Sequence, residues 1–246
     1  MLLLRHGGDF TERRIEQHGW FVLRHVALGT AVFAGLALTI SPLLGLIGGA
    51  IVIAGAKADF KRWGNWQAGK AGELAATDVL KALPNEYVLL NDLMLPDGCG
   101  NVDHLVIGPN GIFVIETKNY SGYVSCWGDR WYVNRREISS LSKQAKRNAM
   151  AIKNSLDGVF REHHARIPWV DPILAFTNST GRLKIKSPTI PVLRSAELPA
   201  FISRYRSASS QPIATPELNR AIVHHLHVLQ QTPDKSFVNT SLPVRN

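Results

Sequence analysis

Residues 101–118, NVDHLVIGPNGIFVIETK, constrain the fold of this chain more than any other stretch. Two apolar, β-rich runs flank Gly108-Pro109-Asn110-Gly111, a four-residue turn signal, and this pattern predicts a β-hairpin. Antiparallel pairing across the turn then joins three pairs of residues: Ile107 with Ile112, Leu105 with Val114, and Asp103 with Glu116.

Charged side chains meet at the open end of this predicted hairpin. Side chains alternate along a strand, so Glu116 and Lys118 point to the same face. Asp103 lies opposite Glu116, at about 5 Å between Cβ atoms, where two like charges destabilise a sheet. A divalent metal ion would neutralise both carboxylates. The alternative is an edge hairpin with charged ends, but the presence of all three residues together favours a site.

Residues 103–122, DHLVIGPNGIFVIETKNYSG, resemble the core of the nuclease-related domain (NERD), a family of the PD-(D/E)xK superfamily of restriction-enzyme-like nucleases. The resemblance covers roughly residues 70–178. The Glu-x-Lys tripeptide alone is a weak signal, and Asp103, the PNG turn, Gly72-Glu73 and Gln144 at suitable separations make it specific. Val102 stands where the superfamily name has proline, which carries no chemistry.

The resemblance implies an α/β fold, with a restriction-endonuclease-like central mixed sheet flanked by helices and preceded here by a hydrophobic membrane segment. It also implies a Mg²⁺ site, in which Mn²⁺ is the alternative metal. Asp103 and Glu116 are the expected ligands, with the backbone carbonyl of Thr117 as a third. Two protein carboxylates are enough because Mg²⁺ keeps several of its waters.

The remaining catalytic roles implied by the resemblance fall on three side chains. Lys118 would stabilise developing charge or position the attacking water, and a lowered pKa would allow it to act as a base. Glu73, on the first helix of the domain, would orient Lys118 or bind the metal through water. Gln144 would hold the water or a phosphate.

The net charge and the cysteine content indicate which partners the chain binds and in which cellular compartment it lies. A formal net charge of +9 favours nucleic acid or anionic lipid, and charge alone does not choose between them. Two cysteines, Cys99 and Cys126, form neither a disulfide framework nor a zinc cluster, which fits a reducing cytoplasm.

Residues 26–56 contain no charged side chain, and this predicts a membrane segment. A spanning helix needs about 20 apolar residues, so the stretch is long for one span and short for two. Ser41-Pro42 near its middle predicts a turn or kink. A tilted span, a hairpin of short helices and a re-entrant segment all remain open. Basic residues on both sides favour the hairpin with both ends in the cytoplasm.

The chain is accordingly predicted to contain a basic N-terminal tail (1–25), a transmembrane segment (26–56), a juxtamembrane linker (57–68), a nuclease-like domain (69–195), and a C-terminal helical extension with a tail (196–246). Helices are expected over 69–83 and 139–159, and from Thr215 onward. Besides the central hairpin, strands are expected over 87–93, 123–126, 130–133, 170–176 and 190–193.

Two groups of side chains have more than one interpretation. The aromatic residues around the predicted second hairpin could stack on bases, although aromatic strands are more often core: Tyr120, Tyr123, Trp127, Trp131 and Tyr132. Lys143, Lys146 and Arg147 lie off the buried stripe of the 139–159 helix. They contact phosphates in one interpretation and form a solvated helix face in the other.

These features predict a membrane-anchored, metal-dependent nuclease that hydrolyses phosphodiester bonds of nucleic acid, with DNA favoured over RNA. Its membrane partner is the lipid bilayer, and its nuclease-like domain lies in the cytoplasm. One alternative is a membrane-tethered nucleic-acid-binding module without turnover, and the other is an adaptor whose basic surface binds anionic lipid. A binder has no need of the Asp103, Glu116 and Lys118 set, so the nuclease is favoured.

Overall fold

The structure is a computed structural model that describes residues 2–3, 9–95, 100–178, 180–205 and 216–231. The chain divides into two compact units, one of residues 8–71 and one of residues 1–7 and 72–246, and the division falls within helix α3 (Lys57–Leu80). Cys99, the helix start at Thr215 and the tail from residue 232 lie outside the described residues.

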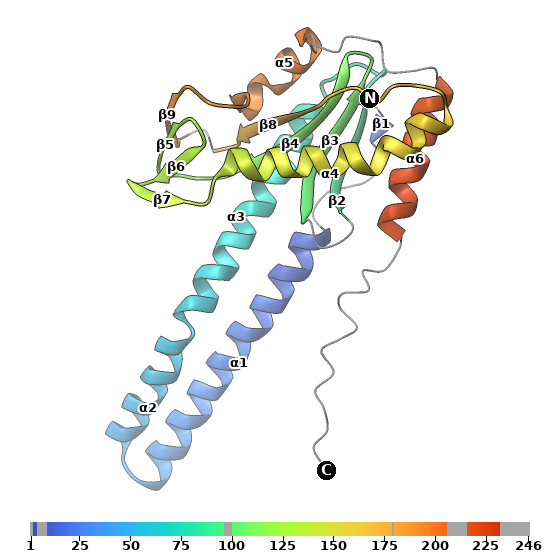
Figure 1. The fold of residues 1–246 in the computed structure, drawn as a ribbon. Helices are drawn as coiled ribbons and strands as arrows, with labels where there is room; N and C mark the ends of the chain where they lie inside the picture. Colours follow the sequence, from blue (N-terminus) through green and yellow to red (C-terminus); the bar gives the residue numbers. More distant parts are fainter. Residues whose placement is uncertain (1, 4–8, 96–99, 179, 206–215, 232–246) are drawn as a thin grey trace, which may run out of the picture. The chain divides into compact units, whose positions relative to one another are not determined.

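The larger unit is α/β, as predicted, and contains two mixed sheets flanked by helices (Figure 1). The first sheet has the strand order β1-β2-β3-β4-β8-β10. Its strands are β1 (Leu2–Leu3), β2 (Val88–Met94), β3 (Asn101–Gly108), β4 (Gly111–Lys118), β8 (Val170–Phe176) and β10 (Val192–Arg194). Strands β2, β3 and β4 are antiparallel neighbours, whereas β8 runs parallel to β4.

The central hairpin has the predicted register. Ile107 pairs with Ile112 and Leu105 with Val114. The ladder continues only to His104 and Ile115, so Asp103 lies one residue beyond the last pair. The turn and the alternation of apolar residues are local features, which explains why they determine the pairing.

The second sheet adds strands that the sequence did not predict. Its order is β7-β6-β5-β9, with β5 (Tyr123–Trp127), β6 (Arg130–Val133), β7 (Arg136–Ile138) and β9 (Arg182–Lys186). The expected β5–β6 hairpin is present, and β9 joins it in parallel alongside β5. This parallel pairing joins segments far apart in the chain, which local patterns cannot predict.

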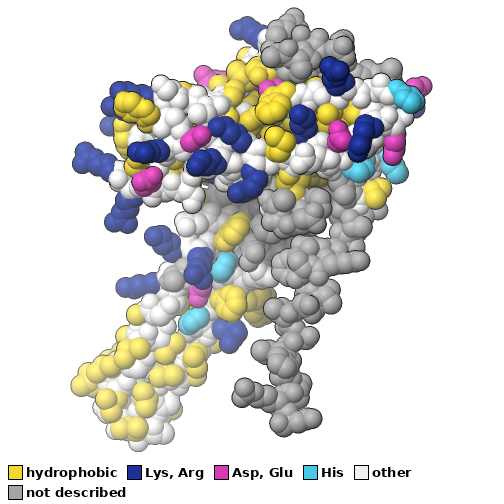
Figure 2. All heavy atoms as spheres, in the orientation of Figure 1, with side chains coloured by type: hydrophobic (Ala, Val, Ile, Leu, Met, Phe, Trp, Pro, Cys, Tyr) yellow, Lys and Arg dark blue, Asp and Glu magenta, His cyan; other side chains and the backbone are white. Residues whose placement is uncertain are grey.

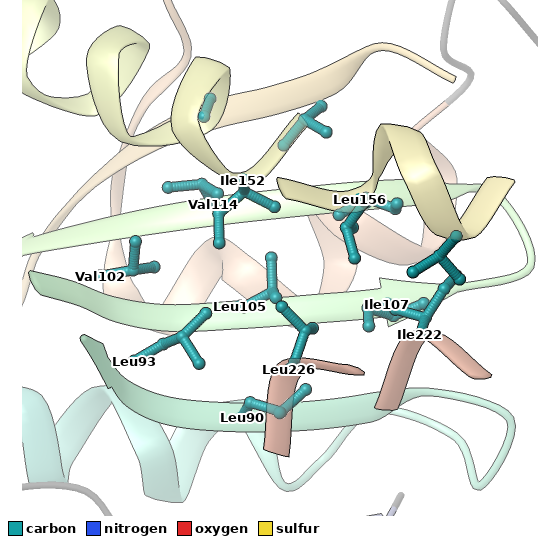
Figure 3. Packing of buried hydrophobic residues seen from close by; sticks show 14 of the residues in the cluster. Leu90, Leu93, Val102, Leu105, Ile107, Val114, Ile152, Leu156, Ile222 and Leu226 are labelled. Atoms are coloured by element: carbon teal, nitrogen blue, oxygen red, sulfur yellow. The ribbon is translucent and has the colours of Figure 1, made fainter. Parts of the chain in front are cut away.

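Helices cover both faces of the first sheet. Helices α4 (Leu141–Glu162) and α6 (Pro216–Gln231) pack on one face, where buried side chains of the strands and both helices interlock (Figure 3): Leu90, Leu93, Leu105, Ile107, Val114, Ile152, Leu156, Ile222 and Leu226. The end of α3 and helix α5 (Leu198–Arg204), which follows the 3₁₀ turn Ser195–Glu197, share a second core with Val106, Phe113 and Ile115.

Two predicted boundaries differ from the structure. Helices α5 and α6 lie in the segment 196–246, predicted as an extension, yet their apolar stripes complete the two cores of the domain. Residues 57–68, predicted as a linker, are helical and continuous with the helix expected over 69–83. This stretch contains no proline that would end a helix, so nothing in it separates the two segments.

The smaller unit contains helix α1 (Asp9–Thr39) and helix α2 (Pro42–Gly55). They are separated at residues 40–41, where Ser41-Pro42 predicts a turn, and the Ser41 hydroxyl accepts a hydrogen bond from the Leu43 N–H at 3.3 Å. Two helical segments of the described chain, Ile15–Thr39 and Pro42–Leu80, are long and apolar enough to cross a membrane.

Glycines bring the backbones of α1 and α2 together. A Cβ atom at Gly45 would lie 2.6 Å from the Phe33 carbonyl oxygen, and one at Gly49 would lie 3.2 Å from the Gly29 carbonyl oxygen. Large apolar side chains meanwhile stay exposed along both helices: Leu38, Leu43, Leu46 and Ile51. Small residues between helices and apolar residues outside are typical of helix pairs in lipid.

We expect Gly45→Ala to loosen this helix pair by about 1–3 kcal/mol, because its methyl group would contact a backbone carbonyl that cannot rotate away. Gly35→Ala is the matched control, since no atom lies within 4 Å of a Cβ there. Amide hydrogen exchange of α1 and α2 in detergent should be faster in Gly45→Ala than in Gly35→Ala. Equal exchange in the two variants would contradict the packing described above.

Candidate active site

The open end of the central hairpin is held together by Asp103 and Thr117. The Thr117 backbone N–H and hydroxyl both donate to Asp103 Oδ2, at 2.7 and 2.8 Å. Asp103 lies beyond the last strand pair, and these two bonds replace the ladder as its connection to β4. They fix the Asp103 carboxylate beside the residue that follows Glu116.

Glu116 is the centre of the site. It is only 2% exposed, and three side chains donate hydrogen bonds to it. Lys118 Nζ lies 2.5 Å from Glu116 Oε1, and Gln144 Nε2 lies 2.6 Å from the same oxygen. Asn148 Nδ2 donates to Oε2 at 3.2 Å. The carboxylate is therefore oriented by its own strand and by helix α4.

Asn148 is the site residue that the sequence did not reveal. It follows Gln144 by four residues, so the two amides lie on the same side of α4, and this spacing was the available signal. Its Nδ2 also donates to the Asn101 carbonyl at 3.0 Å. Its buried Oδ1 has no hydrogen-bond partner among the described residues, which leaves one acceptor inside the site.

Glu73 reaches the site because of the glycine before it. A Cβ at Gly72 would lie 2.7 Å from Thr177 Oγ1 and 3.0 Å from the Asn119 Cβ, so only glycine lets α3 approach the ends of β4 and β8 this closely. The half-buried Glu73 is near enough for its charge to raise the pKa of Glu116.

Burial and, to a smaller extent, the charge of Asp103 raise the pKa of Glu116, and its net value is about 7. Lys118 opposes both effects through its charge and its hydrogen bond. Glu116 therefore exchanges its proton near neutral pH, so a metal ion binding there below pH 7 would have to displace that proton.

The pKa of Lys118 is shifted by the same neighbouring charges, which here favour the charged form. Burial lowers its pKa, but the charges of Glu116 and Asp103 raise it by more, and the net pKa lies above its ordinary value. Lys118 is therefore a fixed cation at neutral pH. The neighbouring His104 adds no charge, because burial lowers its pKa to about 4.

The charges of the site suit a divalent cation held partly by water. When Glu116 is ionised, Glu73, Asp103 and Glu116 bring three carboxylates against the one cation of Lys118. The described residues contain no group of three or more His, Cys, Asp or Glu side chains placed to hold a metal. Zinc sites usually take three or four protein ligands, whereas Mg²⁺ accepts one or two carboxylates and keeps its waters.

The three basic residues of helix α4 that the sequence suggested as phosphate contacts lie on the outer side of that helix. Lys143 and Arg147 are exposed, whereas both carboxylate oxygens of Asp129 lie 3.2 Å from Lys146 Nζ. The aromatic residues divide in a similar way. Trp131 is core, with its indole N–H donating to the Ser142 hydroxyl at 2.7 Å, but Trp127 is exposed.

Part of the chain is similar to a known protein family. Residues 68–177 match the family model of the nuclease-related domain. An uncharacterized protein of Bacillus anthracis is 40% identical over 60 residues, which cover 23% of this chain and 28% of that protein. No solved structure shows significant similarity to the chain. The matched segment contains Glu73, Asp103, Glu116, Lys118, Gln144 and Asn148. Residues 68–177 of this chain are therefore similar to the nuclease-related domain.

Proposed function

We propose that this chain is a membrane-anchored nuclease that hydrolyses phosphodiester bonds of nucleic acid, DNA in the first place, with Mg²⁺ as cofactor. The observation that carries the proposal is the buried Glu116, on which Lys118, Gln144 and Asn148 converge from two elements beside Asp103. A buried carboxylate with a pKa near 7 among other charged groups is typical of a catalytic site.

Asp103 and Glu116 would hold the metal ion, and a backbone carbonyl such as that of Thr117 would complete the protein ligands. A bound Mg²⁺ supplies Lewis acidity and lowers the pKa of its water. Thr117 keeps Asp103 in place, while Gln144 and Asn148 keep Glu116 from rotating.

Lys118 keeps its positive charge at neutral pH, so its role is to stabilise the negative charge that develops on the phosphoryl oxygens. The raised pKa argues against Lys118 as the general base. Glu73 adds negative charge near Glu116 and raises the pKa of that carboxyl.

The helix pair α1–α2 would anchor the protein in the bilayer. The helical segments Ile15–Thr39 and Pro42–Leu80 are each long and apolar enough to cross the bilayer, and they are separated at Ser41. Two such segments in succession would form a hairpin that enters and leaves the bilayer on one side. Basic residues at both of its ends then place the nuclease-related domain in the cytoplasm.

The proposal is tested with the full-length chain in detergent, incubated with plasmid DNA, single-stranded DNA and RNA. Each substrate is treated with Mg²⁺, Mn²⁺ or EDTA. We expect cutting with metal, none with EDTA, and none by Asp103→Ala, which removes a metal ligand. Asp78→Ala, which removes an exposed carboxylate of the same domain, should cut like wild type.

Cutting that persists in EDTA or in Asp103→Ala would overturn the metal-dependent mechanism. A folded wild-type protein that retains nucleic acid but never cuts it would instead be a binding module without turnover. Gel analysis of the products separates these outcomes and identifies the nucleic acid that is cut.

A further inference from the structure

The outer face of the four-stranded sheet is unlike the rest of the domain surface. Strand β5 alternates, so Val124 and Cys126 point into a core cluster with Trp131, while Tyr123 and Trp127 point outward. Tyr123 is 36% exposed and Trp127 is 69% exposed. The small Ser125 lies between them. The two rings thus stand about 13 Å apart along one extended strand, on an open face.

Strand β9 places a row of cations beside these rings. The parallel register pairs Tyr123 with Arg182, Ser125 with Lys184, and Trp127 with Lys186. All three basic side chains are exposed, and Lys186 Nζ lies 5.6 Å from the centre of the Trp127 ring. On the other side of β5, Arg130 of β6 pairs with Trp127.

Positive charge on this sheet is not balanced by acids. Its strands and their turns carry basic residues at six positions: Arg130, Arg135, Arg136, Arg182, Lys184 and Lys186. The acids are Asp129 and Glu137, and Asp129 is bound by Lys146 and Thr189. Within the described part of the chain, no carboxylate pairs with the β9 cations. Figure 2 shows Lys and Arg side chains gathered over these strands, beside hydrophobic ones.

The pattern of exposed rings next to a row of cations fits single-stranded nucleic acid. Unpaired bases stack on aromatic faces, and the phosphates follow the basic residues. A duplex hides its base faces inside the helix, so it could use the cations but not the rings. An anionic membrane would likewise need the charges and no ordered spacing of aromatic residues.

The sheet also lies next to the candidate active site along the chain. Lys118 is the last residue of β4, and Tyr123 is the first residue of β5. Tyr120, in the short connection, is close enough to influence the pKa of Lys118. The outer face of this sheet therefore begins only a few residues along the chain from Lys118.

We propose that the outer face of the β7-β6-β5-β9 sheet binds single-stranded nucleic acid, by stacking bases on Tyr123 and Trp127 and pairing phosphates with Arg182, Lys184 and Lys186. This inference rests on the proposed nuclease function, and it names the form of substrate that the site receives. Binding and cutting are separable, so each can fail without the other.

The test is fluorescence anisotropy of a labelled single-stranded oligonucleotide with the full-length chain in detergent and EDTA. Trp127→Ala should weaken binding about fivefold or more, the range expected for one stacked base. The matched control is Trp169→Ala, because Trp169 is 48% exposed and Lys153 Nζ lies 4.9 Å from its ring centre. This variant should bind like wild type. Circular dichroism confirms that both variants are folded.

Two further measurements test the role of the lysines and the preference for single-stranded over double-stranded nucleic acid. Replacing Lys184 and Lys186 by glutamine should reduce the slope of log affinity against log salt by about 0.7 per lysine. Binding of the same sequence as a duplex should change little in Trp127→Ala. Equal effects of Trp127→Ala and Trp169→Ala, or an equal loss for duplex and single strand, would overturn the proposal.

The outcomes distinguish this inference from the nuclease function. If Trp127→Ala impairs binding but wild type never cuts, the binding face stands and the nuclease function fails. If cutting is metal-dependent but binding is independent of Trp127, the nuclease function stands and the proposed binding face fails. A third outcome is that Trp127→Ala affects only the attachment of phosphatidylserine vesicles to nanodisc-embedded protein, which would make this face a lipid contact and overturn the proposal.

Discussion

Replacing Lys118 by methionine will lower metal-dependent cleavage by about 100- to 1,000-fold, the loss expected when one charged donor to the transition state is removed. Methionine has an unbranched apolar chain of about the length of the lysine hydrocarbon stem and lacks only the charged group at its end. Gln144 and Asn148 still donate to Glu116, so the carboxylate keeps two of its three hydrogen bonds. The domain should therefore remain folded, and the loss should fall on catalysis.

Metal binding distinguishes this catalytic role from a structural one. Without the neighbouring cation, the pKa of Glu116 rises above its present value of about 7, because Lys118 is the group that lowers it. Below that pKa the proton competes with the metal. At a pH above this raised pKa the carboxylate is ionised, and Lys118→Met should bind Mn²⁺ in calorimetry while cleavage is still lost.

Two variants complete this test. Lys143→Met removes an exposed lysine from α4 and should leave cleavage unchanged. Lys118→Arg keeps the charge and should retain more activity than Lys118→Met. If Lys118→Met cleaves within tenfold of wild type at its optimal pH, then Lys118 has no part in stabilising the transition state.

The parts of this site that could be predicted from sequence are those fixed by local geometry. The turn at Pro109-Asn110 and the alternation around it determine the hairpin register, and Asp103, just beyond the ladder, then accepts hydrogen bonds from Thr117. The family resemblance added Glu73 and Gln144, and the structure supplies a physical reason for the first. Gly72 permits the close approach of α3 to β4 and β8, without which Glu73 could not reach the site.

The parts that could not be predicted depend on pairing between distant segments. Alternation along β5 separates Tyr123 and Trp127 from Val124, but it does not say which face is buried. Which face of β5 is buried depends on the pairing of β9 with β5 and on the packing of the core cluster that contains Trp131. Helix α6 is likewise far in sequence from the strands of the first sheet on which it packs, so the sequence alone predicted this helix as an extension of the domain.

Asn148→Asp will destabilise the metal-free domain by about 3–5 kcal/mol at pH 8, the range for an unpaired charge introduced into a buried site. The substitution keeps the shape of the side chain but removes both donated hydrogen bonds, to Glu116 Oε2 and to the Asn101 carbonyl. It also places a second carboxylate against one that is 2% exposed. The midpoint of thermal unfolding should fall by on the order of 10 °C.

The pH dependence of this loss follows from the sign of the pKa shifts. Both carboxyls are harder to ionise in the folded chain than in the unfolded chain, and Glu116 already has a pKa of about 7. The penalty is therefore small below about pH 4, where the carboxyls are protonated in the folded and the unfolded chain, and it grows as the pH rises from there through the folded pKa. Mg²⁺ should restore part of the stability at pH 8, because it neutralises the added charge.

Asn154→Asp is the matched control, since it makes the same change at an exposed position of α4. It should unfold within about 2 °C of wild type at every pH. If Asn148→Asp is equally harmless at pH 8, then Glu116 is not confined by α4, and Asn148 does not help to hold the Glu116 carboxylate. If it destabilises the domain but Mg²⁺ restores nothing, Asn148 holds the carboxylate and the added charge lies out of reach of the metal.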